Sequence, residues 1–403
     1  MADSNNINVK NARVDMAKND AQRNIYLSGR LPQISIQGDY RYNAVIPAQI
    51  VPADFFGGPP GSFAKVKFGV PFTLSNTLQV NQFLYNPQLS YGLAALEINS
   101  KITEVQEIIA VQEVIYQVSS TYFSLQAIQQ QLDYLIINEK NMDNLIQNMI
   151  LMMQQGLIIP TEIDKLKMNK ISISNAILKL ENTSQQLLQY LKILVGIKED
   201  QPLEMVKDNI ASNPIIIEKT TVSRPELELI RLQKQMNLEE QKGTKMAYFP
   251  TLSFYAALNY NYNLKPENNF RTGIPSAFLG LHLDWTVFDG LEKKNKLKLN
   301  LYNKEKIDNQ ESLANSNLNL ATENAKREIL LQTSNLEMSK EQLQLAEKVY
   351  AVSNSQYKSG TISTNELLQG DNNLQMAQSN LVGAYLQLRL AELNYLKSIS
   401  QLK

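Results

Sequence analysis

The feature that most constrains the fold is a long segment without residues that break helices. Between Gly290 and Gly360 the chain contains neither proline nor glycine. Large side chains recur there every seven residues, at Ile329, Leu336, Leu343, Tyr350 and Tyr357. This spacing predicts one helix over 290–358 with a coiled-coil seam. At ~1.5 Å per residue the helix would be about 100 Å long, so the sequence predicts an elongated molecule.

An alternating segment directly precedes this helix. From Leu279 to Val287 every second residue is large and apolar, and the residues between them are small or polar. A period of two predicts a strand with one apolar and one polar face. Three further segments alternate in the same way, near residues 34–42, 72–81 and 252–262. The sequence therefore predicts four strands in two hairpins, over 33–86 and 251–288.

The other segments with helical periodicity are predicted from their apolar spacing and from the breakers that end them. The seam of the first long helix is predicted to contain Val111, Ile115, Val118, Tyr122, Leu125, Leu132 and Ile136. Gly156 ends this helix, which must then fold back on the next one as an antiparallel hairpin. The predicted helices cover 4–28, 89–155, 161–194, 225–247 and 364–402.

The order of elements occurs twice, which predicts an internal repeat. Repeat 1 covers 1–196 and repeat 2 covers 225–403, with a connector over 197–224 that contains a short strand at Ile215–Ile217. The glycines Gly156 and Gly360 lie 204 residues apart. At the same offset, four positions of the first seam match large apolar positions of the second: Leu125, Leu132, Ile146 and Met153.

Composition excludes several classes of function. The chain has 39 basic and 39 acidic residues, whereas a nucleic-acid-binding surface needs a concentrated basic face. It has no cysteine and one histidine, which excludes disulfides, Cys/His zinc sites and histidine-dependent triads. No constellation of carboxylates or lysines indicates catalysis, a cofactor or a metal. We therefore expect a protein that is not an enzyme.

The strands, and not the helices, indicate a membrane. No segment has about 18 consecutive apolar residues, the length of a transmembrane helix, and the start lacks the pattern of a signal peptide. The protein is therefore either cytoplasmic or has lost an export signal, and the four alternating segments favour the second. Each strand is about ten residues long, which suffices for a tilted strand to cross a bilayer. An amphipathic sheet packed on helices in a soluble α+β protein is the alternative, but such long helices leave little surface for it.

A sheet in lipid must close on itself, because open edges leave backbone groups without hydrogen bonds. Four strands are too few, so the protomers must associate. Two would give 8 strands and a filled barrel, whereas three would give 12 strands and room for water. We expect a lipid face that contains Ile34, Ile36, Leu74, Leu78, Leu252, Phe254, Leu281 and Leu283. Asp39, Arg41, His282 and Asp284 are expected in the barrel lumen, or simply on a solvated face. The loop 44–68 is expected to be extracellular.

The repeated order of elements resembles the TolC-like outer-membrane efflux protein family over nearly the whole chain. The residues that carry the resemblance are Leu31-Pro32, Phe249-Pro250, Trp285–Gly290 and Tyr357–Thr361. The resemblance implies a homotrimer with a 12-stranded barrel in the bacterial outer membrane and a long α-helical barrel in the periplasm. It also implies an exit duct for efflux or type I secretion, with a periplasmic adaptor protein and an inner-membrane transporter as partners.

The same resemblance implies roles for the two helical turns. Gly156, Leu157, Gly360 and Thr361 would form the tips that contact the adaptor. Family members carry acidic residues just after these turns, so Thr161, Glu162, Glu366 and Gln369 would line a periplasmic aperture. Gathered carboxylates in a trimer would raise one another's pKa values and attract cations. Ile362 stands where some members have a basic residue, so a salt-bridged lock is not expected.

Each of these assignments has a simpler alternative. Ser363 and Glu366 have the spacing of a capping box, and so do Thr161 and Asp164. The methionines near the end of the first long helix suit copper(I), but flexible packing is the favoured interpretation. They are Met142, Met149, Met152 and Met153. For the whole chain, the rival interpretations are a coiled-coil scaffold of the cell envelope or cytoplasm without a pore and a stand-alone porin.

Overall fold

The computed structural model describes residues 5–198, 200–203, 205 and 224–402. The predicted strand at Ile215–Ile217 lies outside the described residues. The chain divides into two compact units. The strand unit contains Ala17–Ser100 and Lys234–Lys306, and the tip unit contains Met1–Met16, Lys101–Gln233 and Ile307–Lys403. Among the described residues, no helix combines the length and apolarity that a membrane span requires.

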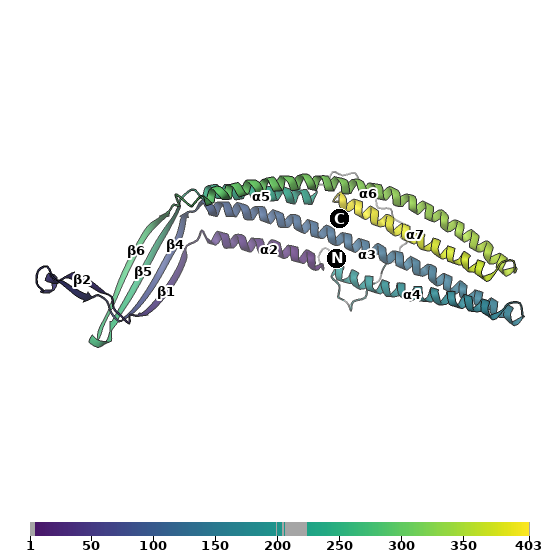
Figure 1. Cartoon of the computed structure of the whole chain (residues 1–403), viewed down its shortest axis with the longest axis horizontal. Coiled ribbons are helices and arrows are strands. Elements are labelled where there is room, and N and C mark those ends of the chain that lie inside the picture. Colours follow the sequence, from purple (N-terminus) through teal and green to yellow (C-terminus); the bar gives the residue numbers. More distant parts are fainter. Residues whose placement is uncertain (1–4, 199, 204, 206–223, 403) are drawn as a thin grey trace. The chain divides into compact units, whose positions relative to one another are not determined.

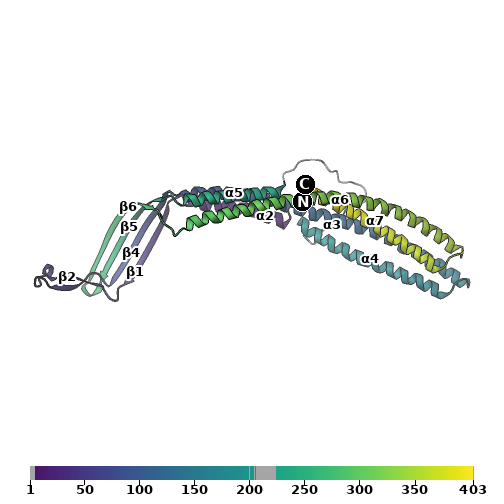
Figure 2. The same ribbon diagram turned by 45° about the horizontal axis from the view of Figure 1, so that its top comes forward.

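The strand unit is built on one antiparallel sheet in the order β1-β4-β5-β6, and these four strands lie side by side in Figures 1 and 2. The alternation of apolar and polar residues explains why these segments become strands, since each alternate residue can face a different environment. β1 and β6 form the two edges. The bounds are β1 (Gln33–Tyr42), β4 (Phe72–Tyr85), β5 (Thr251–Lys265) and β6 (Phe270–Asp284).

The register places most of the large aliphatic side chains of the four strands on one face. One row across the sheet is Ile36, Leu78, Leu258 and Ala277. Phe254 pairs with Leu281 on this face, and Leu252 pairs with Leu283. All eight residues predicted for the lipid face therefore share one side of the sheet, which we call the apolar face.

Both hairpins differ from the prediction. The first contains a second sheet in the loop 44–68, made of β2 (Ala48–Pro52) and β3 (Phe63–Lys67) with the short helix η1 (Ala53–Phe56) between them. These two strands are not among the four predicted ones.

In the second hairpin, the strand predicted to continue through Val287 ends at Asp284. Asp284 pairs with Thr251, the first residue of β5. Pro250 precedes Thr251 and has no backbone N–H to extend the ladder. Beyond this point Trp285 donates its Nε1–H to the backbone oxygen of Tyr248 at 3.0 Å.

Tyrosines packed over glycines connect the helices of the strand unit. A Cβ atom at Gly92 would lie 2.1 Å from the ring of Tyr26, and one at Gly243 would lie 2.3 Å from the ring of Tyr91. These approaches link α2 to α3 and α3 to α5, and a larger residue at either glycine would require the tyrosine ring to shift. The helices concerned are α2 (Ile7–Ser28), α3 (Pro87–Gln154) and α5 (Pro225–Met246), and α6 (Glu292–Lys358) follows β6.

The tip unit contains two helical hairpins with apolar cores. α3 is followed by α4 (Pro160–Val195), and α6 is followed by α7 (Thr364–Ser398), which lies beside α6 in Figures 1 and 2. The seven-residue spacing on α6 is confirmed as a core, because Leu336 and Leu343 pack with Leu374 of α7.

One position of the first predicted seam is wrong. Ile136 is 51% exposed, and its neighbour Leu135 is buried instead. Leu135 is buried because it packs in a core to which other helices contribute. Leu166 of α4 and Leu367 of α7 belong to the same cluster.

Candidate functional site

The polar face of the sheet is the first candidate site. Asp39, Arg41, His282 and Asp284 all lie on it, because their ladder partners are Ser75, Thr73, Ser253 and Thr251. Arg41 and Asp39 form an exposed ion pair with 3.4 Å between Nη2 and Oδ1. The register thus brings the four predicted lumen residues to one side of the sheet.

Small polar side chains cover the middle of this face. Ser75 Oγ donates to Asn261 Oδ1 at 2.6 Å, and Thr77 Oγ1 donates to Asn259 Oδ1 at 2.7 Å. These cross-strand pairs satisfy one another and present hydroxyl and amide groups to the surroundings. Such a surface suits contact with water.

The two helical turns of the tip unit close in the same way. At the first, the N–H groups of Gly156 and Leu157 donate to the carbonyls of Met153 and Met152 at 2.9 and 3.0 Å. At the second, Gly360 and Thr361 donate to Tyr357 and Gln356 at 3.0 and 2.9 Å. These are Schellman motifs, and both glycines have the positive φ that the motif requires, 73° and 75°.

Both turns present exposed residues beyond their glycines. Leu157 is 65% exposed and Ile159 is 61% exposed. Thr361 is also exposed, and its Oγ1 donates to the Gln356 carbonyl at 2.9 Å. The predicted tip residues are therefore open to a partner surface.

Glu162 lies in the first turn of α4 and contacts the other hairpin. The Thr364 hydroxyl and the Lys165 ammonium hold the pKa of Glu162 below its usual value. The Lys165 Nζ is 2.9 Å from Glu162 Oε1. Within one chain, the shift is therefore opposite in sign to the one expected from gathered carboxylates.

Glu366 has the predicted capping role. The Ser363 N–H donates to Glu366 Oε2 at 2.9 Å, and the Glu366 N–H donates to Ser363 Oγ at 3.3 Å. This capping box starts α7 and leaves Glu366 and Gln369 exposed.

The second predicted capping box is wrong. Helix α4 starts at Pro160, with Ile159 as its N-cap and no side-chain hydrogen bond to the cap. Proline at the first helical position needs no capping of its own nitrogen, so the helix begins one residue earlier than Thr161. Thr161 is exposed, and Asp164 pairs with Lys167 at 3.5 Å.

Two of the methionines of the first hairpin pack in an apolar core. Met142 and Met149 are only 2% and 1% exposed and belong to the core between the helices. The Tyr357 hydroxyl donates to Met149 Sδ at 2.6 Å. The structure describes no group of three or more potential His, Asp or Glu metal ligands among its residues.

Sequence reasoning missed a buried polar cluster between the two hairpins. Asp371 is 5% exposed, and its Oδ2 accepts hydrogen bonds from Asn169 at 3.3 Å and from Gln375 at 2.6 Å. Burial raises the pKa of Asp371, although the two amides oppose this effect. Burial also raises the pKa of Tyr350, with a contribution from Asp371, to about 12. The signal in the sequence was a charged residue at a core position of α7.

Comparisons with known proteins agree with this fold. Residues 216–399 match the family model described as outer membrane efflux protein. No match was found among curated protein sequences.

Three solved outer membrane proteins share the architecture. CmeC of Campylobacter jejuni has a TM-score of 0.75 at 15% identity, over 99% of this chain and 84% of CmeC. MtrE of Neisseria gonorrhoeae has a TM-score of 0.74 at 13% identity, over 100% of this chain and 88% of MtrE. VceC of Vibrio cholerae has a TM-score of 0.72 at 13% identity, over 99% of this chain and 94% of VceC. The chain is thus similar to the TolC-like outer membrane efflux proteins, with the family model matched in its second half and the fold of solved outer membrane channels over nearly its whole length.

Proposed function

We propose that this protein is the outer membrane exit duct of a tripartite efflux or type I secretion system. The observation that supports it best is the sheet β1-β4-β5-β6, whose apolar face carries exposed Ile34, Ile36 and Leu281. These side chains are 69%, 79% and 63% exposed. Apolar side chains so exposed along all four strands need a nonaqueous environment, and lipid supplies one.

Closure of this sheet requires other copies of the chain. β1 and β6 are both edges, and because the four strands alternate in direction, β6 of one copy would run antiparallel to β1 of the next. Three copies would give 12 strands, with the polar face of Asp39, Arg41 and His282 around a water-filled lumen. The internal repeat, with one hairpin per half, would then give the barrel a pseudo-sixfold arrangement.

The helical tips would face the periplasm. Gly156, Leu157, Gly360 and Thr361 would meet the adaptor protein, which links the duct to an inner-membrane transporter. Three copies of Glu162 and of Glu366 would form the acidic rings of the aperture, with Thr161 and Gln369 beside them. The duct would open to the cell exterior at the end of the barrel that carries the loop 44–68.

A coiled-coil scaffold without a pore is the second candidate, because α3 and α6 both have packed helical partners. The decisive experiment is purification in detergent followed by electron microscopy and conductance measurement in planar bilayers. Observation of a threefold tube that conducts ions would support the proposed duct. A monodisperse protein that is soluble without detergent and does not conduct would favour the scaffold.

A further inference from the structure

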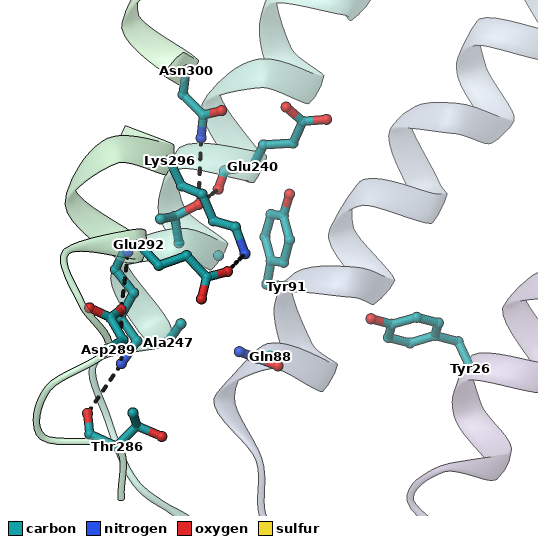
Figure 3. Close-up of a pocket in the computed structure, with 13 residues that line it drawn as sticks. Tyr26, Gln88, Tyr91, Glu240, Ala247, Thr286, Asp289, Glu292, Lys296 and Asn300 are labelled. Atoms are coloured by element: carbon teal, nitrogen blue, oxygen red, sulfur yellow. Dashed lines mark hydrogen bonds and ion pairs between the residues drawn. The ribbon is translucent and has the colours of Figure 1, made fainter. Parts of the chain in front are cut away.

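A polar cavity lies in the strand unit where strands give way to helices. It has a volume of about 530 Å³ and is lined by residues of α2, α3, α5 and α6 together with the turn after β6. This volume falls within the ~300–1,000 Å³ range of small-molecule sites. Figure 3 shows Tyr26, Gln88 and Tyr91 on one side of the cavity, opposite Glu292 and Lys296.

The cavity walls carry charges of both signs. One wall is fixed, since Lys293 Nζ is 3.2 Å from the Thr286 carbonyl oxygen and 3.6 Å from Asp289 Oδ2, and its side chain is only 13% exposed. The Lys293 ammonium also lies 5.3 Å from the centroid of the Tyr248 ring. Lys293 is thus a structural part of the wall.

Lys296 and Glu292 are the adaptable groups. Their side chains are 58% and 61% exposed, and 2.6 Å separates Lys296 Nζ from Glu292 Oε1. An exposed ion pair one helical turn apart contributes little to stability, so a ligand with its own charges can replace this contact.

Glu240 and Tyr91 also contribute polar groups to the cavity. Glu240 lines the cavity from α5, and its carboxylate is exposed near the Tyr91 hydroxyl (Figure 3). Burial, Glu240, Glu239 and Tyr26 raise the pKa of Tyr91 to about 12, so its hydroxyl remains a donor at neutral pH. The cavity therefore offers the Lys296 ammonium and the Tyr91 hydroxyl to an anionic group of a ligand. It also offers the Glu240 and Glu292 carboxylates to a cationic group.

The surroundings of the cavity have the composition of a membrane interface. Tyr85, Phe249, Trp285 and Phe288 stand at the ends of the strands or just beyond them, and they are 48%, 55%, 59% and 76% exposed. Exposed aromatic residues at strand ends are typical of the level where lipid headgroups lie. If the sheet spans the membrane, the cavity opens at that level on the helical side.

We propose that this cavity binds the headgroup of a zwitterionic phospholipid with a primary ammonium, such as phosphatidylethanolamine. Lys296 and Tyr91 take the phosphate, while Glu240 and Glu292 accept hydrogen bonds from the ammonium. The inference rests on the proposed function, because the proposed function supplies the membrane. A lipid held at this place would connect α3 with α5 and α6 next to the sheet.

The test measures lipid binding by native mass spectrometry of the detergent-purified, delipidated protein. The probes are short-chain phosphatidylethanolamine, phosphatidylcholine, whose ammonium has no N–H donor, and phosphatidylglycerol, which has no ammonium. We expect phosphatidylethanolamine to bind about tenfold more tightly than either, since one charge-assisted hydrogen bond corresponds to about that factor.

The variant pair Glu240→Gln and Lys296→Gln should abolish this preference. The matched control is Glu305→Gln with Lys306→Gln, two exposed residues of α6 outside the cavity. Equal binding of the three lipids by wild type, preferred binding of phosphatidylglycerol, or an unchanged preference in the cavity variant would each overturn the proposal. Conductance recorded on the same preparations separates this failure from failure of the proposed duct.

Discussion

At the scale of single residues, Asp371 shows how burial converts a charge into a pH-dependent contribution to stability. Its folded-state pKa is raised by burial, so the folded protein binds this proton more tightly than the unfolded chain does. The contribution is fully present below the unfolded pKa of about 4 and is lost as pH rises through the folded pKa. Protonation of Asp371 therefore favours the contact between α4 and α7.

We expect Asp371→Asn to be more stable than wild type at neutral pH and to lose this pH dependence. Asparagine keeps an oxygen for Asn169 and Gln375 but carries no charge to desolvate. Thermal unfolding in detergent between about pH 5 and 8 measures the difference, which corresponds to about 1.4 kcal/mol for each unit of pKa shift. Asp164→Asn, at a site with 68% side-chain exposure, is the control and should change little. Lower stability of Asp371→Asn than of wild type would contradict this prediction, because it would show that the charge of Asp371 has a stabilising partner.

Glu162 and Glu366 provide the second prediction at this scale. If they form acidic rings in a trimer, the channel should prefer cations at neutral pH, and acidification should weaken that preference. Because Thr364 and Lys165 lower the pKa of Glu162, we expect Glu162 to keep its charge to a lower pH than an ordinary glutamate. Thr364→Val should move the loss of this charge to higher pH in single-channel recordings.

The double variant Glu162→Gln and Glu366→Gln should reduce the cation preference without changing the barrel. Glu181→Gln, an exposed acidic residue elsewhere on α4, serves as the control. Wild-type selectivity in the double variant would rule out the rings as a filter. The capping of α7 would then be the whole role of Glu366.

At the scale of elements, the two helical turns close with the same hydrogen-bond pattern, and both present exposed residues. Their Schellman motifs hold Leu157 and Thr361 just after a left-handed glycine. If the protein is the proposed duct, we expect Leu157→Trp and Thr361→Trp to abolish export while the trimer still forms, because a large side chain there would block the proposed adaptor surface. An export assay and native gels measure the two outcomes.

Lys65→Trp on the exposed strand β3 is the control for these tip variants, since it adds the same bulk in the other unit. It should leave export unchanged. Survival of export in the tip variants would place the adaptor contact elsewhere on the helices.

At the scale of the whole molecule, the two faces of the sheet predict opposite responses to the same substitution. Ala277 lies on the apolar face beside Leu258, and its neighbour Ser276 lies on the polar face beside Asn259. In lipid, Ala277→Arg should cost about 2–4 kcal/mol, as expected near the midplane, and lower the amount of assembled trimer. Ser276→Arg should insert normally.

Leu281→Arg extends this comparison along β6. Leu281 shares the apolar face but lies nearer the end of the strand at Asp284, so the cost should be smaller than at Ala277. Quantitative immunoblots of outer membrane fractions would compare the three variants. Equal assembly of all three would contradict the membrane assignment.

The sequence by itself determined the features that depend on local periodicity and on chain breakers. Alternation placed the four long strands, the seven-residue spacing placed Leu336 and Leu343 in a core, and the glycines marked both turns. The capping box of Ser363 and Glu366 was also predictable, because its partners are three residues apart. These features depend on residues that are close together in the sequence and not on contacts with distant segments.

Only the tertiary structure decided the features that depend on distant partners. Thr364 lowers the pKa of Glu162 from another hairpin, and Asn169 reaches Asp371 across 202 positions of the chain. The choice of Leu135 over Ile136 for the core came from helices that arrive later in the sequence. Strand β6 stopped at Asp284 because its partner strand begins after Pro250. The environment of a side chain depends on every element that packs around it. A sequence pattern describes only the element that contains the side chain.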